Sequence, residues 1–362
     1  MRLLSRLSLL LASAFVMAQE FNFKGVPADY AITFATAGSR GLKLADSPEA
    51  KSFRQRMEKI VAGLDPSAKG SKEMQEAVKA AIGMDLESPD THIAGGLSMD
   101  ASMKLTGGVL IRARHDGRKL ASHAAAKKVG SLQAGATKGW NAQQFLASLS
   151  DELAQASKDF PVDGAGATGE VAPIGVFDVD DDTLVIAQPK EAARIIALLK
   201  GQGASYALPA SLRPQVNATG RPYAVVSVNA AKLPSNPELA NSGFLGAIFA
   251  MGENQSDQVM KISAYFSSKE KAAPLAQQAQ GMVLMLPMMA AGDPTKPQSA
   301  EDKEIQALLG EFLAGIQPID AAGNQVTLTA KWDTLKLFGM LEKLITIGSK
   351  KMKEMPQPAK KK

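Results

Sequence analysis

The chain has 362 residues, contains no cysteine and carries a formal net charge of +5. The absence of cysteine excludes disulfide bonds, thiol catalysis and metal sites built on thiolates. A chain of this length is long enough for two domains and can bury a sizeable core without covalent cross-links.

The positive charge is confined to the two ends of the chain. Residues 1–18 contribute +2 and the lysine-rich tail at residues 350–362 contributes +5, which leaves −2 for residues 19–349. Domains that bind nucleic acid present a basic face, so we expect no nucleic-acid partner. The tail is polar and contains two prolines, which predicts disorder and at most a weak contact with an anionic surface.

The first eighteen residues have the pattern of a cleavable signal peptide. Arg2 and Arg6 precede an apolar run at residues 7–16, and a predicted cleavage site lies between Ala18 and Gln19. A run of about ten apolar residues suits a signal peptide, whereas a membrane span needs about 20. We therefore expect export to the periplasm or the extracellular medium, with no transmembrane span.

Residues 19–203 predict a first unit of mixed helices and strands. Tyr30, Ile32 and Phe34 recur with period two and share one face of a predicted strand. Further strands are predicted at residues 109–111, 175–177 and 183–187, and helices at residues 53–64, 145–153 and 192–199. From about residue 91 the predicted order is strand, strand, helix, helix, strand, strand, helix.

Residues 204–349 predict a second unit in which the same order returns. Strands are predicted at residues 223–228, 260–266 and 326–330, before a last helix at residues 335–345. The recurrence favours a tandem repeat, and the alternative is a chain that produces this order without duplication. We expect an α+β fold of two units, each an antiparallel sheet with helices packed on one face, because alternating apolar and polar residues are typical of one-sided sheets.

An acidic segment that contains Asp178, Asp180 and Asp182 joins two of the predicted strands. Aspartate is favoured in tight turns because its side chain bonds the nearby backbone, so the first interpretation is a polar hairpin turn. The second is a calcium site on these three carboxylates, since oxygen ligands suit calcium. The segment lacks the glycine and glutamate positions of an EF-hand loop.

Residues 281–291 form the most apolar run after the signal peptide and contain Met282, Met285, Met288 and Met289. The run is too short to span a bilayer. It predicts a buried helix in which flexible methionines fill gaps. The alternatives are a surface on these methionines for an apolar ligand or partner, and a Cu(I) site on their thioethers.

No segment carries a complete catalytic motif. The G-x-G-x-x-G match at residues 164–169 follows a predicted helix end instead of a strand, so it predicts a loop and not a dinucleotide site. His92, His115 and His123 lack the spacing of a metal-binding pair, and His115 precedes a turn signal. We expect no cofactor, and a hydrolase site assembled from distant carboxylates stays open.

Four short segments at the boundaries of predicted strands and helices are distinctive. They are the opening Val26-Pro-Ala-Asp29, the strand Asp182-Thr-Leu-Val-Ile-Ala187 that leads into a helix, the helix start Ser267-Ser-Lys-Glu-Lys-Ala272, and the strand Gly323-Asn-Gln-Val-Thr-Leu-Thr-Ala330 before the final helix. Together they resemble exported α+β proteins of the planctomycete and verrucomicrobial kind, a domain of unknown function. The resemblance covers most of the chain after the signal peptide. It implies export and a tandem α+β architecture, and it supplies no catalytic residues.

These observations predict an exported, non-enzymatic protein that acts as a binding or structural module of the bacterial cell envelope. One alternative is a periplasmic carrier of a lipid or other apolar ligand. The other is a hydrolase whose carboxylates come from distant positions.

Overall fold

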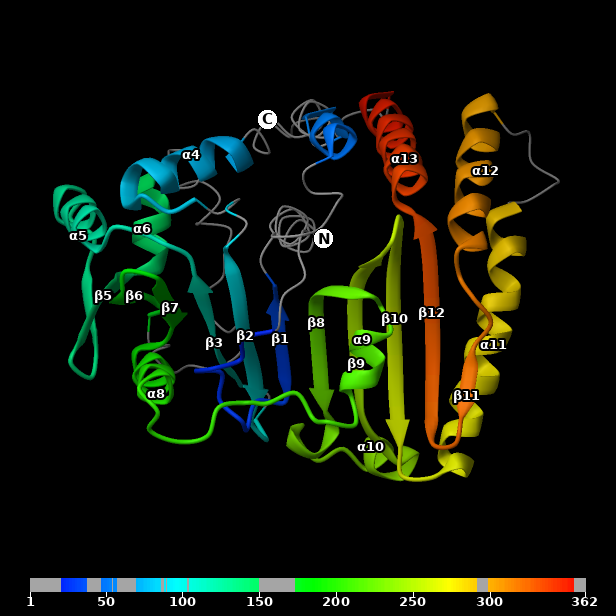
Figure 1. Ribbon diagram of the computed structural model, residues 1–362, viewed down its shortest axis with the longest axis horizontal. Coiled ribbons are helices and arrows are strands. Elements are labelled where there is room, and N and C mark those ends of the chain that lie inside the picture. The colour runs from blue at the N-terminus through cyan, green and yellow to red at the C-terminus, as the bar shows by residue number, and fades with distance from the viewer. Residues whose placement is uncertain are drawn as a thin grey trace, which may run out of the picture.

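The computed structural model describes residues 21–37, 47–53, 55–56, 70–85, 88, 90–102, 104–149, 173–291 and 299–354. Within these ranges, twelve strands form one sheet in which all neighbouring strands run antiparallel (Figure 1). Helices accompany the sheet, and the α+β class is confirmed. The predicted signal peptide, the G-x-G-x-x-G match and residues 355–362 lie outside the described residues.

The strands follow one another across the sheet in an order that differs from their order in the chain. From one edge to the other they are β11 (Asp320–Ala322), β12 (Gln325–Asp333), β10 (Asp257–Phe266), β9 (Phe244–Asn254), β8 (Arg221–Asn229), β1 (Ile32–Thr36), β2 (His92–Met99), β3 (Leu105–Arg112), β7 (Thr183–Ala187), β6 (Gly175–Asp180), β5 (Thr137–Asn141) and β4 (Ser131–Ala134). Counted outward from the centre, the N-terminal half thus contributes β1-β2-β3-β7-β6-β5-β4, and the C-terminal half contributes β8-β9-β10-β12-β11.

The two halves share a single sheet, which corrects the expectation of a separate sheet for each unit. Phe34 of β1 lies opposite Gly95 of β2 on one side and opposite Val226 of β8 on the other. An unpaired strand edge exposes a row of backbone donors and acceptors. Pairing β1 with β8 satisfies the two edges that separate sheets would leave open in the middle of the molecule.

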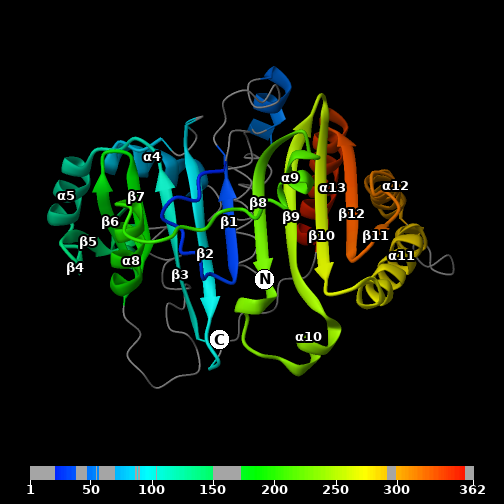
Figure 2. The same ribbon diagram turned by 60° about the horizontal axis from the view of Figure 1, so that its bottom comes forward.

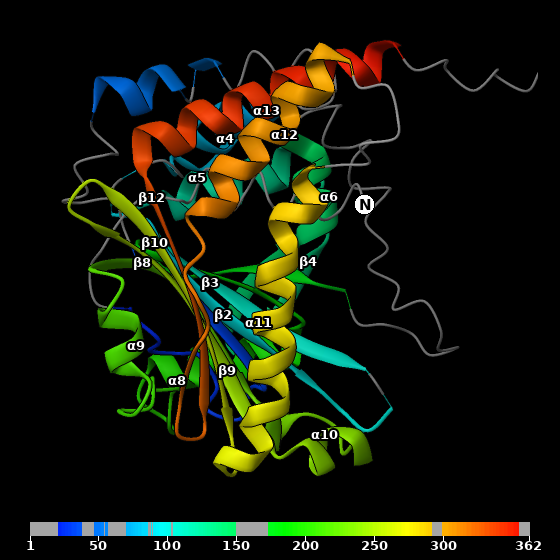
Figure 3. The same ribbon diagram turned by 90° about the vertical axis from the view of Figure 1, so that its right-hand side faces the viewer.

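The described helices are α4 (Gly70–Ile82), α5 (Gly117–Ala126), α6 (Ala142–Leu149), α8 (Pro189–Leu199), α9 (Arg213–Asn217), α10 (Pro237–Ser242), α11 (Lys269–Ala291), α12 (Ala300–Ala314) and α13 (Thr334–Glu354). They lie on both sides of the sheet. Figure 3 shows α8 and α9 on one side and α11, α12 and α13 on the other. None of the described helices combines the length and apolar character that a membrane span requires.

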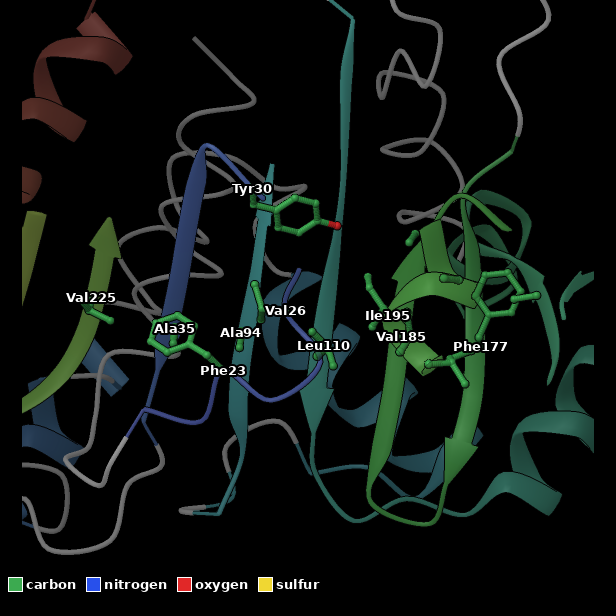
Figure 4. Packing of buried hydrophobic residues seen from close by; sticks show 14 of the residues in the cluster. Phe23, Val26, Tyr30, Ala35, Ala94, Leu110, Phe177, Val185, Ile195 and Val225 are labelled. Atoms are coloured by element: carbon green, nitrogen blue, oxygen red, sulfur yellow. The ribbon is translucent and has the colours of Figure 1, made fainter. Parts of the chain in front are cut away.

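The first core lies between the sheet and α8 (Figure 4). Leu110 of β3 and Ile195 of α8 are both fully buried there. The segment before β1 covers the same face with the ring of Tyr30, whose Oη donates a hydrogen bond to Glu191 Oε1 at 2.7 Å. A Cβ atom at Gly96 would lie 2.4 Å from Tyr30 Cδ2, so a glycine is needed where this ring crosses β2.

The second core lies on the opposite face of the same strands. Val176 of β6 and Leu184 of β7 pack there with Leu120 of α5 and Phe145 of α6. Because successive residues of a strand point to opposite faces, Leu184 meets these helices while Val185 meets α8. The outer strands β6 and β7 of the N-terminal half are therefore covered on both faces, and the prediction of helices on one face was wrong for these strands.

The third core covers the C-terminal end of the sheet. Trp332 of β12 stacks on Phe312 of α12 with ring centroids 4.7 Å apart, and its Nε1 donates to the Phe312 carbonyl at 2.7 Å. Met340 of α13 and Leu308 of α12 complete this cluster. The first turns of α11 pack nearby through Ala272. Figure 2 shows these three helices at one end of the sheet and α4 and α5 at the other.

Candidate functional site

The centre of the sheet carries apolar side chains on both faces, and its covered face also contains small hydroxyl side chains. On the face covered by α8 and α9, the side chains of Thr33, Ser227, Ser263 and Thr327 are buried. On the opposite face, the central strands present large apolar side chains that stay half-buried or exposed. A one-sided sheet ordinarily places its apolar side chains on the covered face. The sequence predicted that Ile32 and Phe34 lie on the covered face. In the structure the covered face holds Thr33 and Ala35, and Ile32 and Phe34 lie half-buried on the opposite face.

We call this surface the open face. Its members are Ile32, Phe34, Leu97, Leu105, Val226, Val228, Phe249, Ile262 and Leu328.

Strand register brings the members of the open face into continuous rows. Phe34 lies opposite Val226, Val226 opposite Phe249, and Phe249 opposite Ile262, which in turn lies opposite Leu328. Neighbouring strands are about 4.8 Å apart, so this row of five side chains extends over roughly 19 Å. The open face is therefore a long apolar strip that runs across the strands.

Exposure distinguishes the open face from the core. Ile262 is 38% exposed and Leu105 is 54% exposed, whereas Ile248 and Val225 on the other face are 1% exposed. Large contiguous apolar surfaces are unusual on monomeric proteins and mark sites for ligands, partners or membranes. The described helices on this side pack at the two ends of the sheet, on Leu184 and on Trp332. The apolar strip lies between these two groups of helices.

The second half of α11 adds apolar surface to this side of the molecule. Met282, Leu284 and Met285 are 53%, 66% and 57% exposed. The prediction of a buried helix with gap-filling methionines is wrong for Met282 and Met285. The side chains of Met288 and Met289 lie outside the described residues. The apolar-surface interpretation stays a prediction, now with two exposed methionines in its favour.

A polar cavity of about 880 Å³ lies at the end of the N-terminal half. It lies where the end of α4, the start of α5 and the turn between β6 and β7 meet. The cavity is lined by Gly83, Asp85, Ser88, Arg114, His115, Asp116, Gly117, Arg118, Lys119, Asp178 and Asp181. The backbone of Asp116 joins two of these elements by donating to the Ile82 carbonyl at 2.7 Å.

His115 and Asp178 form the buried part of the cavity wall. The His115 side chain is fully buried, its Nε2 lies 2.9 Å from Asp178 Oδ1, and its Nδ1 lies 3.1 Å from the Ala113 carbonyl. Gly117 allows this approach, because a Cβ atom there would lie 2.3 Å from Asp178 Oδ2. Both partners of the imidazole are hydrogen-bond acceptors, so a protonated ring that donates from both nitrogens satisfies them.

The electrostatics of His115 agree with this geometry. Burial by itself lowers the pKa of His115, but the hydrogen bonds to Asp178 and Ala113 and the charges of Asp178 and Asp180 raise it, and the net effect is a raised pKa. A general base needs a free nitrogen within reach of its substrate. Both nitrogens of His115 are occupied, so its role in this arrangement is to connect the start of α5 to β6.

The acidic segment is the predicted hairpin turn between β6 and β7. Asp180 Oδ1 accepts a hydrogen bond from the Asp182 backbone nitrogen at 3.0 Å, which is the local bond expected of a turn aspartate. Asp178 instead points to His115. In the part of the chain that is described, no group of three or more histidine, aspartate or glutamate side chains is arranged to hold a metal ion. The calcium prediction for Asp178, Asp180 and Asp182 gains no support.

Sequence reasoning identified His115 and Asp178 separately and missed their pairing. Sixty-three positions separate them, and no local pattern links a residue after one strand to a residue inside another. The open face was also missed, because the sequence shows which residues of a strand share a face and not which face is covered. One signal in the sequence could have indicated the open face: β8 and β9 carry apolar residues at consecutive positions, and therefore on both faces of the sheet.

Comparison with solved structures gives distant matches. No protein-family model matches the chain, and no curated protein matches it. Crystal form I of TP0453 matches with 8% identity and a TM-score of 0.37 over 92% of this chain and 99% of that chain. Crystal form III of TP0453 matches with 7% identity and a TM-score of 0.40 over 88% and 97%.

Proposed function

We propose that this chain is an exported binding protein that holds a lipid or other apolar ligand on the open face. The observation that carries the proposal is the row of large apolar side chains on the open face, which stay half-buried or exposed; Ile262, Leu97 and Leu105 are 38%, 39% and 54% exposed. Burial of apolar surface stabilises a complex by about 25 cal/mol per Å². A ligand on the open face would bury apolar side chains that are half-buried or exposed in the described structure.

The shape of the open face favours an extended ligand over a compact one. Its central row crosses five strands over roughly 19 Å and contains no charged side chain among Phe34, Val226, Phe249, Ile262 and Leu328. An acyl chain matches a narrow apolar strip of this kind. Met282 and Met285 on α11 provide further flexible apolar surface, since methionine adapts to varied apolar partners.

Binding of a neutral fluorescent probe tests the proposal. The protein would be titrated with N-phenyl-1-naphthylamine, with a long-chain fatty acid as competitor. Leu97→Gln and Ile262→Gln on the open face should each weaken binding by about tenfold, because each removes one large apolar contact. Leu146→Gln on α6 is a matched control, since Leu146 is 38% exposed and Leu97 and Ile262 are 39% and 38% exposed.

The pattern across these variants decides between outcomes. Weaker binding by the two open-face variants, with normal binding by the control, supports the proposal. The proposal would be refuted if the two open-face variants bound the probe as tightly as the Leu146→Gln control, or if the unsubstituted protein did not bind the probe. Native mass spectrometry of protein purified from its own host would show a co-purifying lipid directly.

The alternative of a hydrolase receives less support from the cavity residues. Asp116 Oδ1 accepts hydrogen bonds from the backbone nitrogens of Arg118 and Lys119, and Asp178 is bonded to His115. Carboxylates that act as a catalytic acid and base must reach the substrate. In this arrangement the two carboxylates are engaged by the protein itself.

We also propose that the two halves of the sheet are a tandem repeat, with units at residues 19–203 and 204–349. The strand order β1-β2-β3-β7-β6 in the first half has the same form as β8-β9-β10-β12-β11 in the second. The hairpin β4–β5 is then an addition to the first unit. If the units are separable, the two fragments expressed together should associate through β1 and β8, and failure to associate would count against the division.

A further inference from the structure

Two methionines of α11 stand out by their access to solvent. Met282 and Met285 are 53% and 57% exposed. Every other methionine whose side chain the structure describes is half-buried or buried. Because the chain contains no cysteine, methionine thioethers are its only sulfur groups. Met282 and Met285 are therefore the described sulfur sites that a dissolved reagent reaches most easily.

The surroundings of the two thioethers on α11 are open and uncharged. Met282 and Met285 are three positions apart, so they lie on the same face of the helix. A Cβ atom on the neighbouring Gly281 would meet no other described atom within 4 Å. Leu284 beside them is 66% exposed, and α11 has no charged residue after Lys271. The pair thus belongs to an apolar surface that solvent reaches.

We infer that Met282 and Met285 form an oxidation site, at which a two-electron oxidant of the peroxide class converts each thioether to a sulfoxide. In the reaction with hydrogen peroxide, the O–O bond breaks and one oxygen atom forms a bond to sulfur. The sulfur loses two electrons, and the other oxygen leaves as water with both hydrogens. Oxidation is selective for accessible sulfur, and exposure separates this pair from the buried Met84 and Met340, which are 1% and 5% exposed.

Oxidation changes the chemistry of the surface on α11. A sulfoxide replaces a flexible apolar side chain by a polar one, and reductases specific for methionine sulfoxide reverse the change. Oxidation of this pair would therefore weaken the binding of an apolar ligand that uses α11, and reduction would restore it. This consequence rests on the function proposed above, whereas the position of the oxidation site does not.

Mass mapping of the oxidised protein tests the site. The full chain would be incubated with hydrogen peroxide, and samples taken over time would be digested and analysed by mass spectrometry. Sulfoxide should form at Met282 and Met285 at least about tenfold faster than at Met84 and Met340, because the exposed fractions differ by about that factor or more. Equal rates at the four residues would overturn the inference.

Probe binding before and after oxidation tests the consequence. The affinity of the unsubstituted protein for N-phenyl-1-naphthylamine should fall by about tenfold after peroxide treatment, because two apolar contacts become polar. In the double variant Met282→Leu/Met285→Leu, the affinity should be the same before and after treatment, since leucine has a similar volume and no sulfur. Met340→Leu is the matched control, and it should lose affinity on oxidation as the unsubstituted protein does.

The combined results separate the two proposals. An equal loss of affinity in the double variant, or no loss in the unsubstituted protein, would show that oxidation of this pair does not control binding. If the untreated protein does not bind the probe, the proposed function fails, and the mass map still decides the oxidation site. The far-ultraviolet circular dichroism spectrum should be unchanged by oxidation, because both side chains are exposed; a loss of helical signal would show that the modification unfolds the protein and would overturn the inference.

Discussion

Replacement of Asp178 by asparagine should destabilise the protein in a pH-dependent way. The His115 side chain is fully buried and the Asp178 side chain is 26% exposed, with 2.9 Å between Nε2 and Oδ1. Loss of one partner from a fully buried ion pair costs about 3–5 kcal/mol. Because Asp178 is partly exposed to solvent, we expect a cost of about 2–3 kcal/mol in the free energy of unfolding while His115 is protonated.

The sign of the pH dependence follows from the direction of the pKa shift. Bonding to Asp178 and Ala113 overcomes the effect of burial and raises the pKa of His115 above its usual 6.5. The ion pair therefore contributes fully below about pH 6.5 and is lost as the pH rises through the raised pKa of the folded state. Above that value the imidazole is neutral, and the cost of Asp178→Asn should fall to about 1 kcal/mol.

Urea unfolding of the two proteins at about pH 6 and about pH 9 would measure this difference. Asp181→Asn is the control, because it removes a neighbouring exposed carboxylate that forms no bond with His115 in the described structure. We expect this control to change stability by less than about 0.5 kcal/mol. A cost of Asp178→Asn that grows with pH, or that equals the cost of the control, would show that the pair is not an ion pair in the folded protein.

Three further substitutions test the packing that supports the site. Thr327→Val should cost about 1–3 kcal/mol in urea unfolding, because it leaves the buried Ser263 hydroxyl without its 2.9 Å partner; adding Ser263→Ala should recover part of the loss, and a purely additive double variant would contradict this. Ser299→Ala removes the capping box of α12 and should cost about 1 kcal/mol by thermal melting, and an unchanged melting temperature would show that the cap contributes nothing. Trp332→Phe keeps the stacking on Phe312 but loses the Nε1 hydrogen bond, so it should cost about 1 kcal/mol, whereas Trp332→Ala should cost about 3–5 kcal/mol; equal costs would mean that the ring contributes little.

Helices, strands and turns that are determined by neighbouring residues in the sequence were predicted well. The acidic turn between β6 and β7 depends on a bond between residues two positions apart, Asp180 and Asp182. The helix α8 begins at Pro189, which suits the first turn, and it carries an apolar stripe that includes Ala192 and Ile195. Such features need only the sequence nearby, so the strand and helix types and the α+β class followed from pattern.

The candidate sites depended on contacts that no local pattern contains. The alternation in β1 places Ile32 and Phe34 on one face, as predicted, but Tyr30, which was predicted to share that face, lies before β1 and packs its ring on the opposite face against Gly96. Thr33 and Ala35 occupy that buried face because the segment before β1 and the helix α8 pack there. The pairing of β1 with β8 depends on strands almost 200 positions apart in the chain.

Period-two alternation in the chain thus determined which side chains of each strand lie together, because neighbouring residues of an extended backbone point in opposite directions. Which of the two faces is covered was decided by where the helices pack. The meeting of His115 with Asp178 was decided in the same way, since both depend on long-range pairing of strands. Long-range pairing is set by the packing of the whole sheet, and a short window of sequence carries no information about it.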